Sequence, residues 1–289
     1  MLGQTRFANY NAPLSNKLAE KGCLIAAHRG SWGGNIIQNT NDAYDTALKM
    51  GADMVEADVV STLDGVLYSF HDENEERLLG VDRSIRQMTS REVDSCHPVN
   101  AINGLCSRRI NRLTEILEHL NHGELLNIDR AWDIFPRLFA VLDQYEDARC
   151  QVIIKAPMRE KQALEALSRH PVKYMFMPIS YSLDDVREIL VWTNINTVGI
   201  ELISFTQQDE LFSNESIRYV HDKNLLTWAN AINLGDYNSK ALFGGLDDDV
   251  SLLKSPDLGW GKLLQKNIDV IQTDWPALLY AYRNKQLGV

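Results

Sequence analysis

The sequence predicts an α/β protein folded as one (β/α)8 barrel, or TIM barrel. Short apolar runs bounded by turn residues recur along the 289 residues, and amphipathic stretches with helical spacing separate most of them. This alternation is typical of a parallel sheet, and eight strands with interleaved helices close a barrel. An open doubly wound sheet is the alternative. However, His28-Arg29-Gly30-Ser31-Trp32 follows the first run, where that fold places a glycine-rich fingerprint.

In chain order, the apolar runs give eight predicted strands and the amphipathic stretches give seven predicted helices. The strands are residues 24–28, 54–58, 125–129, 151–155, 174–179, 197–202, 225–230 and 269–273. The helices are residues 40–50, 111–119, 134–145, 160–168, 183–192, 213–223 and 260–266. Each helix follows a strand, as a parallel barrel requires.

One apolar run breaks the alternation. Residues 66–70 follow the second strand after only an Asp64-Gly65 turn, which leaves no room for a crossover helix and indicates a hairpin. We interpret this hairpin as an excursion that folds His71 back toward Glu56 and Asp58. The polar, turn-rich segment that follows, residues 73–109, is predicted to form an inserted cap over the same face.

A second insertion, residues 235–259, precedes the last strand, and we expect it over the same face as a lid or an interface. Its Asp247-Asp248-Asp249 run is either a second cation site or a solvated acidic turn. We favour the turn, because the spacing is not that of a calcium loop. No repeat or low-complexity linker divides the chain, so residues 1–289 are predicted to form a single domain with these two insertions.

Composition and charge argue against two classes of binding partner. The chain is 45% hydrophobic, enough for a sizeable core, and its formal net charge of -10 argues against nucleic acids and anionic membrane surfaces. Residues 1–21 are polar, and no stretch has the length and apolarity of a membrane span, so we expect a cytoplasmic protein. The four cysteines lack paired spacing, which favours free thiols. The oligomeric state stays open, a homo-oligomer included.

A pair of carboxylates ends the second predicted strand. Residues two apart in a strand point the same way, so Glu56 and Asp58 project into the barrel mouth while Ala57 faces the helices. Two adjacent carboxylates repel unless a cation lies between them, and we favour a metal over a lysine or arginine partner. Asp129 ends the next barrel strand and adds a third hard oxygen ligand. Such ligands suit Mg²⁺ or Ca²⁺, and the sequence does not separate the two.

Two histidines bracket this carboxylate pair along the chain. His28 ends the first strand and His71 follows the hairpin, so two imidazoles can act as acid and base on opposite sides of a reacting centre. Phosphodiester cleavage needs such a pair. Arg29 can bind phosphate oxygens in a bidentate manner, and Lys155 at the end of the fourth strand offers another positive charge. Either cation is alternatively a structural counter-ion to the carboxylates.

Taken together, these residues resemble the glycerophosphodiester phosphodiesterase family, part of the phosphatidylinositol-phospholipase-C-like barrel superfamily. The resemblance spans almost the whole chain. In order, its motifs are His28-Arg29-Gly30, Gln38-Asn39-Thr40, Gly51-Ala52-Asp53-x-x-Glu56-x-Asp58-Val59, Thr62-x-Asp64-Gly65, His71-Asp72, residues 111–117, Leu126-Asn127-Ile128-Asp129, Thr227-Trp228-Ala229-Asn230 and residues 269–276.

The resemblance implies roles for the site residues. His28 and His71 are implied to be the acid and base catalysts, and Arg29 to bind phosphate. Glu56, Asp58 and Asp129 are implied to be the ligands of a divalent cation, Mg²⁺ or Ca²⁺. Trp228 lies in one of the last motifs, and we count it with Arg29 and Lys155 among the residues expected to bind substrate.

The implied activity is the metal-dependent hydrolysis of a small-molecule glycerophosphodiester to sn-glycerol 3-phosphate and an alcohol. A glycerol hydroxyl attacks phosphorus, the alcohol leaves, and water opens the resulting cyclic phosphate. Two alternatives stay open. One is a lyase that resembles sphingomyelinase D and releases the cyclic phosphate. The other is a phosphate-ester binding protein without catalysis.

Three departures from the family pattern bear on the substrate. Gln38 replaces the usual glutamate of a Glu-Asn-Thr motif and removes a negative charge at the mouth. Asp129 replaces the commoner glutamate, as in the sphingomyelinases D that this sequence resembles there. Ala131 replaces a frequent lysine, so the phosphate loses an expected cation unless Lys155 supplies it.

Overall fold

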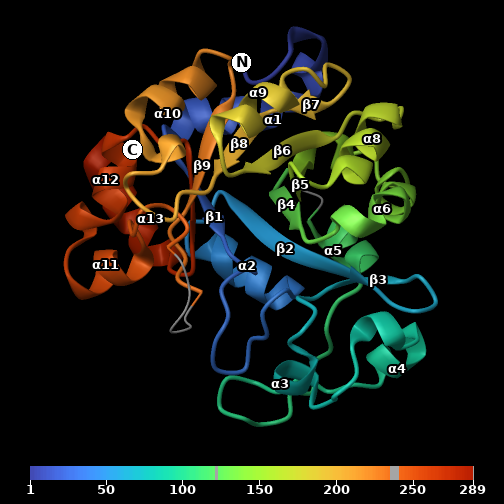
Figure 1. Ribbon diagram of the computed structural model, residues 1–289. Helices are drawn as coiled ribbons and strands as arrows, with labels where there is room; N and C mark the ends of the chain where they lie inside the picture. The colour runs from blue at the N-terminus through green and yellow to red at the C-terminus, as the bar shows by residue number, and fades with distance from the viewer. Residues whose placement is uncertain (121–122, 235–240, 289) are drawn as a thin grey trace.

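Eight parallel strands close into a barrel (Figure 1). The structure is a computed structural model that describes residues 1–120, 123–234 and 241–288. Around the ring the strands run β1, β2, β4, β5, β6, β8, β9 and β10, and β10 pairs again with β1. Their bounds are Leu24–Ala27, Met54–Ser61, Leu125–Asp129, Val152–Pro157, Met175–Ser180, Gly199–Leu202, Leu226–Asn230 and Val270–Thr273. The predicted barrel is therefore confirmed, with every predicted strand in it.

The predicted helices also form, mostly with shorter bounds. They are α2 (Asn41–Lys49), α5 (Leu113–His119), α6 (Phe135–Leu142), α8 (Lys161–Arg169), α9 (Leu183–Ile189), α10 (Asn214–His221) and α12 (Trp260–Gln265). Their apolar faces pack on the outward side chains of the strands and form the large outer core. A short strand, β7 (Asn196–Thr197), pairs with β6 just before β8 begins.

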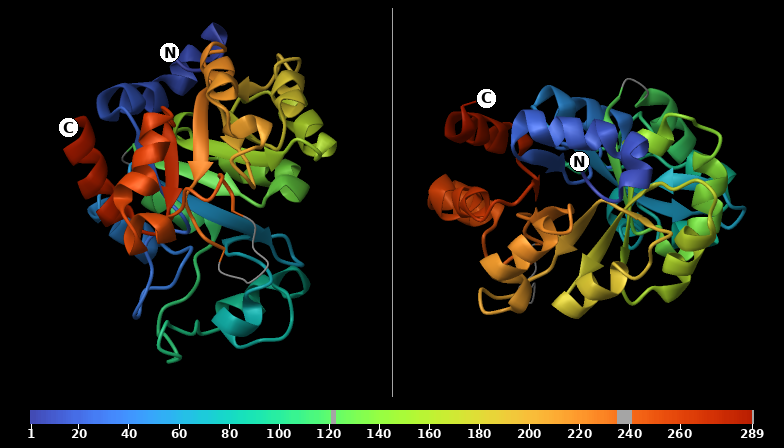
Figure 2. Two further views of the ribbon diagram at one scale, coloured as in Figure 1. Left: turned by 60° about the vertical axis from the view of Figure 1, so that its left-hand side comes forward. Right: turned by 90° about the horizontal axis from the view of Figure 1, so that it is seen from above.

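Two long helices and four short ones were missed by the sequence analysis. The long ones are α1 (Ala8–Lys21) and α13 (Pro276–Leu287), and the short ones are α3 (Glu75–Leu79), α4 (Ser90–Asp94), α7 (Ala148–Gln151) and α11 (Asp248–Leu253). Apolar residues are too sparse in α1 to give a clear helical period. Its Leu14 is nevertheless fully buried against the apolar residues inside the barrel. Seen from above, α1 lies across the end of the barrel (Figure 2).

The predicted hairpin forms and begins the cap. Strand β3 (Leu67–Ser69) pairs antiparallel with the end of β2, and Gly65 turns the chain with φ of +89°. Beyond it, α3 and α4 pack on the hairpin around a separate apolar cluster that includes Tyr68, Phe70 and Leu79. The cap lies at the end of the barrel opposite α1, next to the carboxyl end of β2 (Figure 1).

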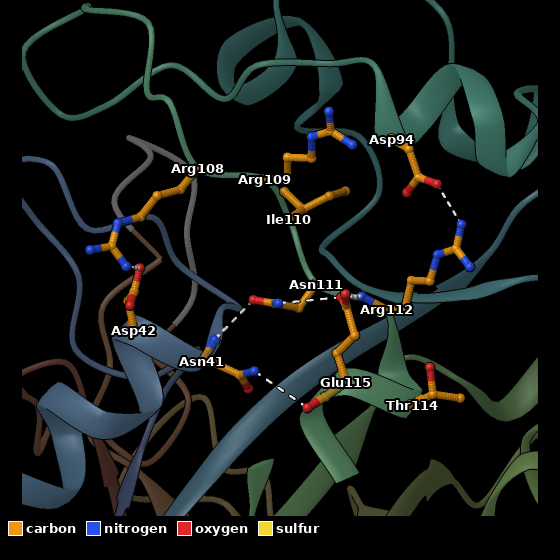
Figure 3. Close-up of a pocket in the computed structure, with 10 residues that line it drawn as sticks. All are labelled: Asn41, Asp42, Asp94, Arg108, Arg109, Ile110, Asn111, Arg112, Thr114 and Glu115. Carbon is orange, nitrogen blue, oxygen red and sulfur yellow. Dashed lines mark hydrogen bonds and ion pairs between the residues drawn. The ribbon is translucent and has the colours of Figure 1, made fainter. Parts of the chain in front are cut away.

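Ion pairs join this cap to the barrel helices around a cavity of about 460 Å³ (Figure 3). Arg108 pairs with Asp42 of α2, and Arg112, just before α5, pairs with Asp94 of α4. Asp94 also accepts a hydrogen bond of 2.7 Å from the Tyr68 hydroxyl. None of the residues predicted to be catalytic lines this cavity. Its charged groups therefore serve to dock the cap.

The described part of the second predicted insertion packs against the side of the barrel. Residues 235–240 lie outside the described residues. Phe243 and Leu246 are buried in the outer core, and Asp248 at the start of α11 is only 2% exposed. The solvated-turn interpretation is therefore wrong for Asp248, because its carboxylate accepts hydrogen bonds from Trp260 Nε1 at 2.7 Å and Thr273 Oγ1 at 2.8 Å.

The inward side chains of the barrel change from apolar to polar along the strands. Near the amino ends they are apolar residues such as Met54, Leu125, Met175 and Val270, closed off by Leu14 of α1. Toward the carboxyl ends they become charged or amide side chains. Buried charges are costly without partners, so this polar half of the interior needs a functional explanation. No helix within the described ranges is both long enough and apolar enough to cross a bilayer.

Candidate active site

The three carboxylates predicted to bind a metal come together on two neighbouring strands. Glu56 and Asp58 lie on β2, and Asp129 ends β4. Asp58 and Asp129 are direct partners in the parallel register of these strands. Glu56 and Asp58 are only 1% and 3% exposed. The structure therefore places the three carboxylates on adjacent strands at the carboxyl end of the barrel.

Their pKa values show how strongly the carboxylates interact. Burial raises the pKa of Glu56 well above its usual range, and the charges of Asp58 and Asp129 raise it further. Burial acts in the same direction on Asp58, but Arg29, His71 and His28 outweigh it and lower the pKa of that carboxyl. Arg29, which stays protonated, is the largest of the influences that favour the ionised form of Asp58.

Arg29 lies at the centre of the site. Its backbone N–H donates to Oε2 of Glu56 at 2.9 Å, and its Nε lies 3.0 Å from Oδ2 of Asp58. It adopts a left-handed backbone with φ of +57°, a conformation that non-glycine residues seldom take. The next residue must be glycine, because a Cβ on Gly30 would come within 2.6 Å of the Ala43 backbone.

Asn39 is a site residue to which the sequence analysis gave no role. Its Nδ2 donates to Oδ2 of Asp58 at 3.0 Å, and its Oδ1 accepts from the Asp58 backbone N–H at 3.1 Å. Like Arg29, it has a positive φ, +59°. The Gln38-Asn39-Thr40 motif was the available signal. Thr40 caps α2, so the asparagine is fixed at the point where the chain enters that helix.

His28 is oriented by a carboxylate from the last strand. Its Nδ1 lies 2.8 Å from Oδ1 of Asp274, which follows β10 directly, and β10 is the neighbour of β1. A carboxylate only accepts hydrogen bonds, so Nδ1 carries the proton and Nε2 is left for proton transfer. Asp274 lies in the motif of residues 269–276, but its role at His28 was not predicted, because 246 residues separate the partners.

His71 follows the hairpin at the edge of the site. Its Nδ1 lies 2.5 Å from the Asp72 carbonyl oxygen, which only accepts, so Nδ1 carries the proton and the contact of 2.9 Å with Nδ2 of Asn74 is not a second hydrogen bond. Among the described residues its hydrogen-bonding contacts use only Nδ1, which leaves Nε2 for proton transfer. Burial lowers the pKa of His71, and the charge of Asp58 opposes that shift. The imidazole is therefore largely neutral near pH 7 and suited to accept a proton.

Lys155 and Trp228 are buried together below the mouth. Lys155 is 1% exposed, with its Nζ 2.9 Å from Oε2 of Glu201, 3.7 Å from Oδ2 of Asp129 and 4.2 Å from the centre of the Trp228 ring. Burial favours its neutral form, but Glu201 and Asp129 outweigh this and raise its pKa. Lys155 is thus a charged counter-ion to the acidic cluster.

Trp228 is fully buried, so its ring supports Lys155 and has no surface open to solvent. Its Nε1 donates to Oδ1 of Asn230 at 2.8 Å and to Oε1 of Gln272 at 3.2 Å. Asn230 in turn donates to Glu201 at 2.7 Å. No role was predicted for Glu201 or Gln272, because single polar residues in apolar runs give no spacing signal.

Arg130 supplies a cation next to Ala131, the position at which the family pattern often has a lysine. Ala131 is fully buried against the outer core, so a lysine there would not point into the mouth as the chain is folded here. Its neighbour Arg130 has φ of +57° and bonds Oδ1 of Asp72 at 3.1 Å through Nη2. Arg130 therefore brings a cation to the rim between β4 and the cap, next to His71.

The three carboxylates are chemically suited to bind a divalent cation. Glu56, Asp58 and Asp129 offer hard oxygen ligands, and their mutual repulsion is what a bound cation relieves. Within the described residues, however, no three histidine, cysteine, aspartate or glutamate side chains form a cluster ready to hold a metal ion. Arg29 already lies against Asp58 and Lys155 near Asp129, so a cation has to compete with these two groups.

Two cavities adjoin the site. One of about 570 Å³ is lined by Trp32, Trp275 and Leu278, together with Asp274. The other, of about 210 Å³, is lined by Gln38 and Arg77 and shares Trp32 with the first. Trp32 and Trp275 are therefore partly exposed next to residues that hold His28 and Arg29, whereas Trp260 is buried like Trp228.

The sequence matches known families over most of its length. The model of the glycerophosphoryl diester phosphodiesterase family matches residues 28–176, which contain every predicted site residue except Trp228. The model of a domain of unknown function matches residues 174–283, which contain Glu201, Gln272 and Asp274. A glycerophosphodiester phosphodiesterase of Caldanaerobacter subterraneus is 32% identical over 108 residues, or 37% of this chain and 44% of that protein. The chain therefore aligns with less than half of that relative.

Solved structures share the fold over nearly the whole chain. A glycerophosphoryl diester phosphodiesterase from Parabacteroides distasonis superposes with a TM-score of 0.70 at 17% identity, covering 95% of this chain and 92% of that one. An Oleispira antarctica phosphodiesterase, solved with its product sn-glycerol-3-phosphate, gives 0.65 at 17% identity and covers 89% and 95% of the two chains.

Proposed function

The chain belongs to the glycerophosphoryl diester phosphodiesterase family, and on this premise we propose that it hydrolyses a glycerophosphodiester to sn-glycerol 3-phosphate and an alcohol. The observation that carries the proposal is the meeting of His28, His71 and Arg29 around the carboxylates of β2 and β4. The Oleispira antarctica protein of the same fold holds sn-glycerol-3-phosphate, which supports this class of product.

The proposed chemistry assigns a separate task to each group. His28, held by Asp274 through Nδ1, moves a proton at Nε2. His71, whose pKa is lowered by burial, takes a proton from the attacking hydroxyl at its own Nε2. Arg29 binds phosphate oxygens through its guanidinium, and Lys155 balances the negative charge of the cluster from below. The attack of a glycerol hydroxyl on phosphorus breaks the bond to the alcohol, which leaves with a proton from Nε2 of His28, and a cyclic phosphate forms. Water then adds to phosphorus and opens the ring to give sn-glycerol 3-phosphate.

Glu56, Asp58 and Asp129 are the residues that would hold a divalent cation, Mg²⁺ or Ca²⁺. When bound, such a cation lowers the pKa of a coordinated hydroxyl and neutralises charge on phosphorus. The chemistry of the donor set supports this assignment. Burial first, and then the charges of Asp58 and Asp129, raise the pKa of Glu56, and a cation would offset the repulsion between these carboxylates.

The two histidines provide the first test. We expect His28→Ala and His71→Ala each to lower kcat for glycerophosphodiesters by about 100-fold or more, because each removes a proton-transfer group. The thermal midpoint should change little. His119→Ala is the matched control, since His119 is partly exposed and pairs with Asp45 away from the site. Activity close to that of the wild type in either His28→Ala or His71→Ala would reject the proposed roles.

Product analysis separates the proposed hydrolysis from its alternatives. Phosphorus NMR of a reaction with Mg²⁺ or Ca²⁺ should show sn-glycerol 3-phosphate as the final product, and a chelator should stop the reaction. A cyclic phosphate that accumulates instead would indicate a lyase, for which Asp129 is the motivating residue. Tight binding of a glycerophosphodiester without any turnover would indicate a binding protein.

A further inference from the structure

The side-chain amide of Gln38 lies buried beside the site. Gln38 is 2% exposed, and its Oε1 accepts from Nη1 of Arg29 at 2.9 Å. A guanidinium only donates, so this contact fixes which end of the amide faces Arg29. The other end, Nε2, is buried and has no hydrogen-bond partner among the described residues. Buried donors are nearly always paired in folded proteins, so this one points to an acceptor that binds there.

An arginine of the cap lies at a cavity next to Gln38, and no carboxylate among the described residues pairs with it. Arg77 of α3 lines the cavity of about 210 Å³ together with Gln38. Its Nε and Nη2 bond the neutral Oδ1 of Asn74 at 3.2 and 2.9 Å. Partial burial, and then the positive charge of Arg29, lower the pKa of Arg77. Within the described part of the chain, Arg77 forms no ion pair that offsets this repulsion.

The cavity therefore carries uncompensated positive charge in a protein whose net charge is -10. Trp32, Asn100 and Asn103 complete its wall with aromatic and polar surface. At about 210 Å³ it suits a small polar group better than a long chain. A glutamate in place of Gln38 would lie next to Arg29 and cancel part of this charge, whereas the amide keeps it. The residue at position 38 thus decides how much of this positive charge is left unbalanced.

We propose that this cavity is an anion subsite for the alcohol part of the substrate. A carboxylate or phosphate on that alcohol accepts a hydrogen bond from Nε2 of Gln38 and pairs with Arg77, while the reacting phosphodiester lies next to Arg29. The inference rests on the proposed function and names its substrate class, which is glycerophosphodiesters of anionic alcohols. Gln38 and Arg77 are then specificity-determining residues.

Four glycerophosphodiesters that differ only at the end of a two-carbon alcohol test this. The alcohols are ethanolamine, ethylene glycol, glycolate and ethylene glycol monophosphate, which end in an ammonium, a hydroxyl, a carboxylate and a phosphate. We expect kcat/KM for the better anionic ester to exceed that for the ethanolamine ester about tenfold or more at low salt, and less at high salt. The better of the two anions identifies the preferred group. Equal or lower values for both anionic esters than for the glycol ester would overturn the proposal.

Two variants should change this preference through charge. Gln38→Glu should lower the anionic-to-ethanolamine ratio about tenfold, and Arg77→Gln, at an exposed position, should act in the same direction. The matched controls are Gln87→Glu and Arg91→Gln, the same changes at exposed cap positions that do not line the cavity. An unchanged ratio in Arg77→Gln would overturn the proposal even if Gln38→Glu failed to fold.

A binding measurement keeps this inference separate from the proposed function. If the wild-type chain hydrolyses none of the four esters, the proposed function fails. The subsite is then judged by calorimetric titration of His28→Ala protein with the glycolate, phosphate and ethanolamine esters. At least one anionic ester should bind about tenfold more tightly than the ethanolamine ester, and Arg77→Gln should remove the difference. Equal affinities would overturn the subsite.

Discussion

Asp248 has a buried carboxylate, and Asp274 links it to His28 of the site. Its Oδ1 accepts hydrogen bonds from Trp260 and Thr273, and its Oδ2 accepts from the Asp274 backbone N–H at 2.9 Å. Burial is the largest influence and raises the pKa of Asp248 to about 7, although these donors favour the charged form. Because Asp274 bonds His28, Asp248 acts as a positioning residue.

We expect Asp248 to make stability depend on pH. Its pKa is raised in the folded chain relative to the ordinary 3.8, so the folded state holds the proton more tightly than the unfolded state. The protonated carboxyl therefore contributes stability that is fully present below about pH 4 and is lost as the pH rises to about 7, on the order of a few kcal/mol. Thermal midpoints of wild type and Asp248→Asn, measured between pH 5 and pH 8, should show this loss only in the wild type. Asp249→Asn, exposed next to it, is the control, and a wild-type profile for Asp248→Asn would contradict the assignment.

Helix α1 closes the barrel at the end away from the site. Leu14 is fully buried against the inward side chains of the strands, which include Leu24, Met54 and Met175. The helix is polar on average and weakly periodic, so its stability depends on this docking and not on its own propensity. The apolar half of the barrel interior is thus sealed on one side by α1 and on the other by the polar cluster.

Leu14→Ala should lower the free energy of unfolding by about 2–5 kcal/mol, because it leaves a cavity at the closed end of the barrel. Urea denaturation followed by circular dichroism measures the change. The control is Leu253→Ala, at a residue that is 81% exposed, which should cost less than about 0.5 kcal/mol. Equal effects of the two substitutions would show that α1 does not seal the barrel.

Buried charged side chains gather at the polar end of the barrel. Glu56, Asp58, Lys155 and Glu201 are all less than 5% exposed. Pairing with Lys155 and Arg29 offsets part of the cost, yet the pKa of Glu56 remains raised. The repulsion between these buried carboxylates lowers the stability of the folded chain. A ligand that balances their negative charge removes part of this cost and so stabilises the whole fold.

A divalent cation should therefore stabilise the whole chain. At about 100 times its dissociation constant, Mg²⁺ or Ca²⁺ should add about 2.7 kcal/mol and raise the thermal midpoint by roughly 5–10 °C. A chelator should reverse the shift. Glu56→Gln should weaken the response, while Glu76→Gln at an exposed position of α3 should keep it. A midpoint that does not respond to either cation would reject a metal at Glu56, Asp58 and Asp129.

Local sequence was sufficient for groups that lie close together on one strand or loop. The alternation at Glu56 and Asp58 predicts their shared face, and the turn at Asp64-Gly65 predicts the hairpin that returns His71. It was insufficient for Asp274 at His28 and for Glu201 at Lys155, since those contacts join strands far apart in the chain. Helix α1 was missed for a related reason, because its buried face is defined by the barrel that it covers.

The barrel and the positions of its eight strands could be predicted from the sequence, because apolar periodicity and the carboxyl ends of parallel strands depend on local residues. The cations that balance the carboxylates and the residue that orients His28 became clear only in the folded chain. The same holds for Gln38, whose Oε1 bonds Arg29 while its Nε2 has no partner among the described residues. Burial, charge balance and hydrogen-bond satisfaction depend on the closed barrel, because it brings distant strands into contact.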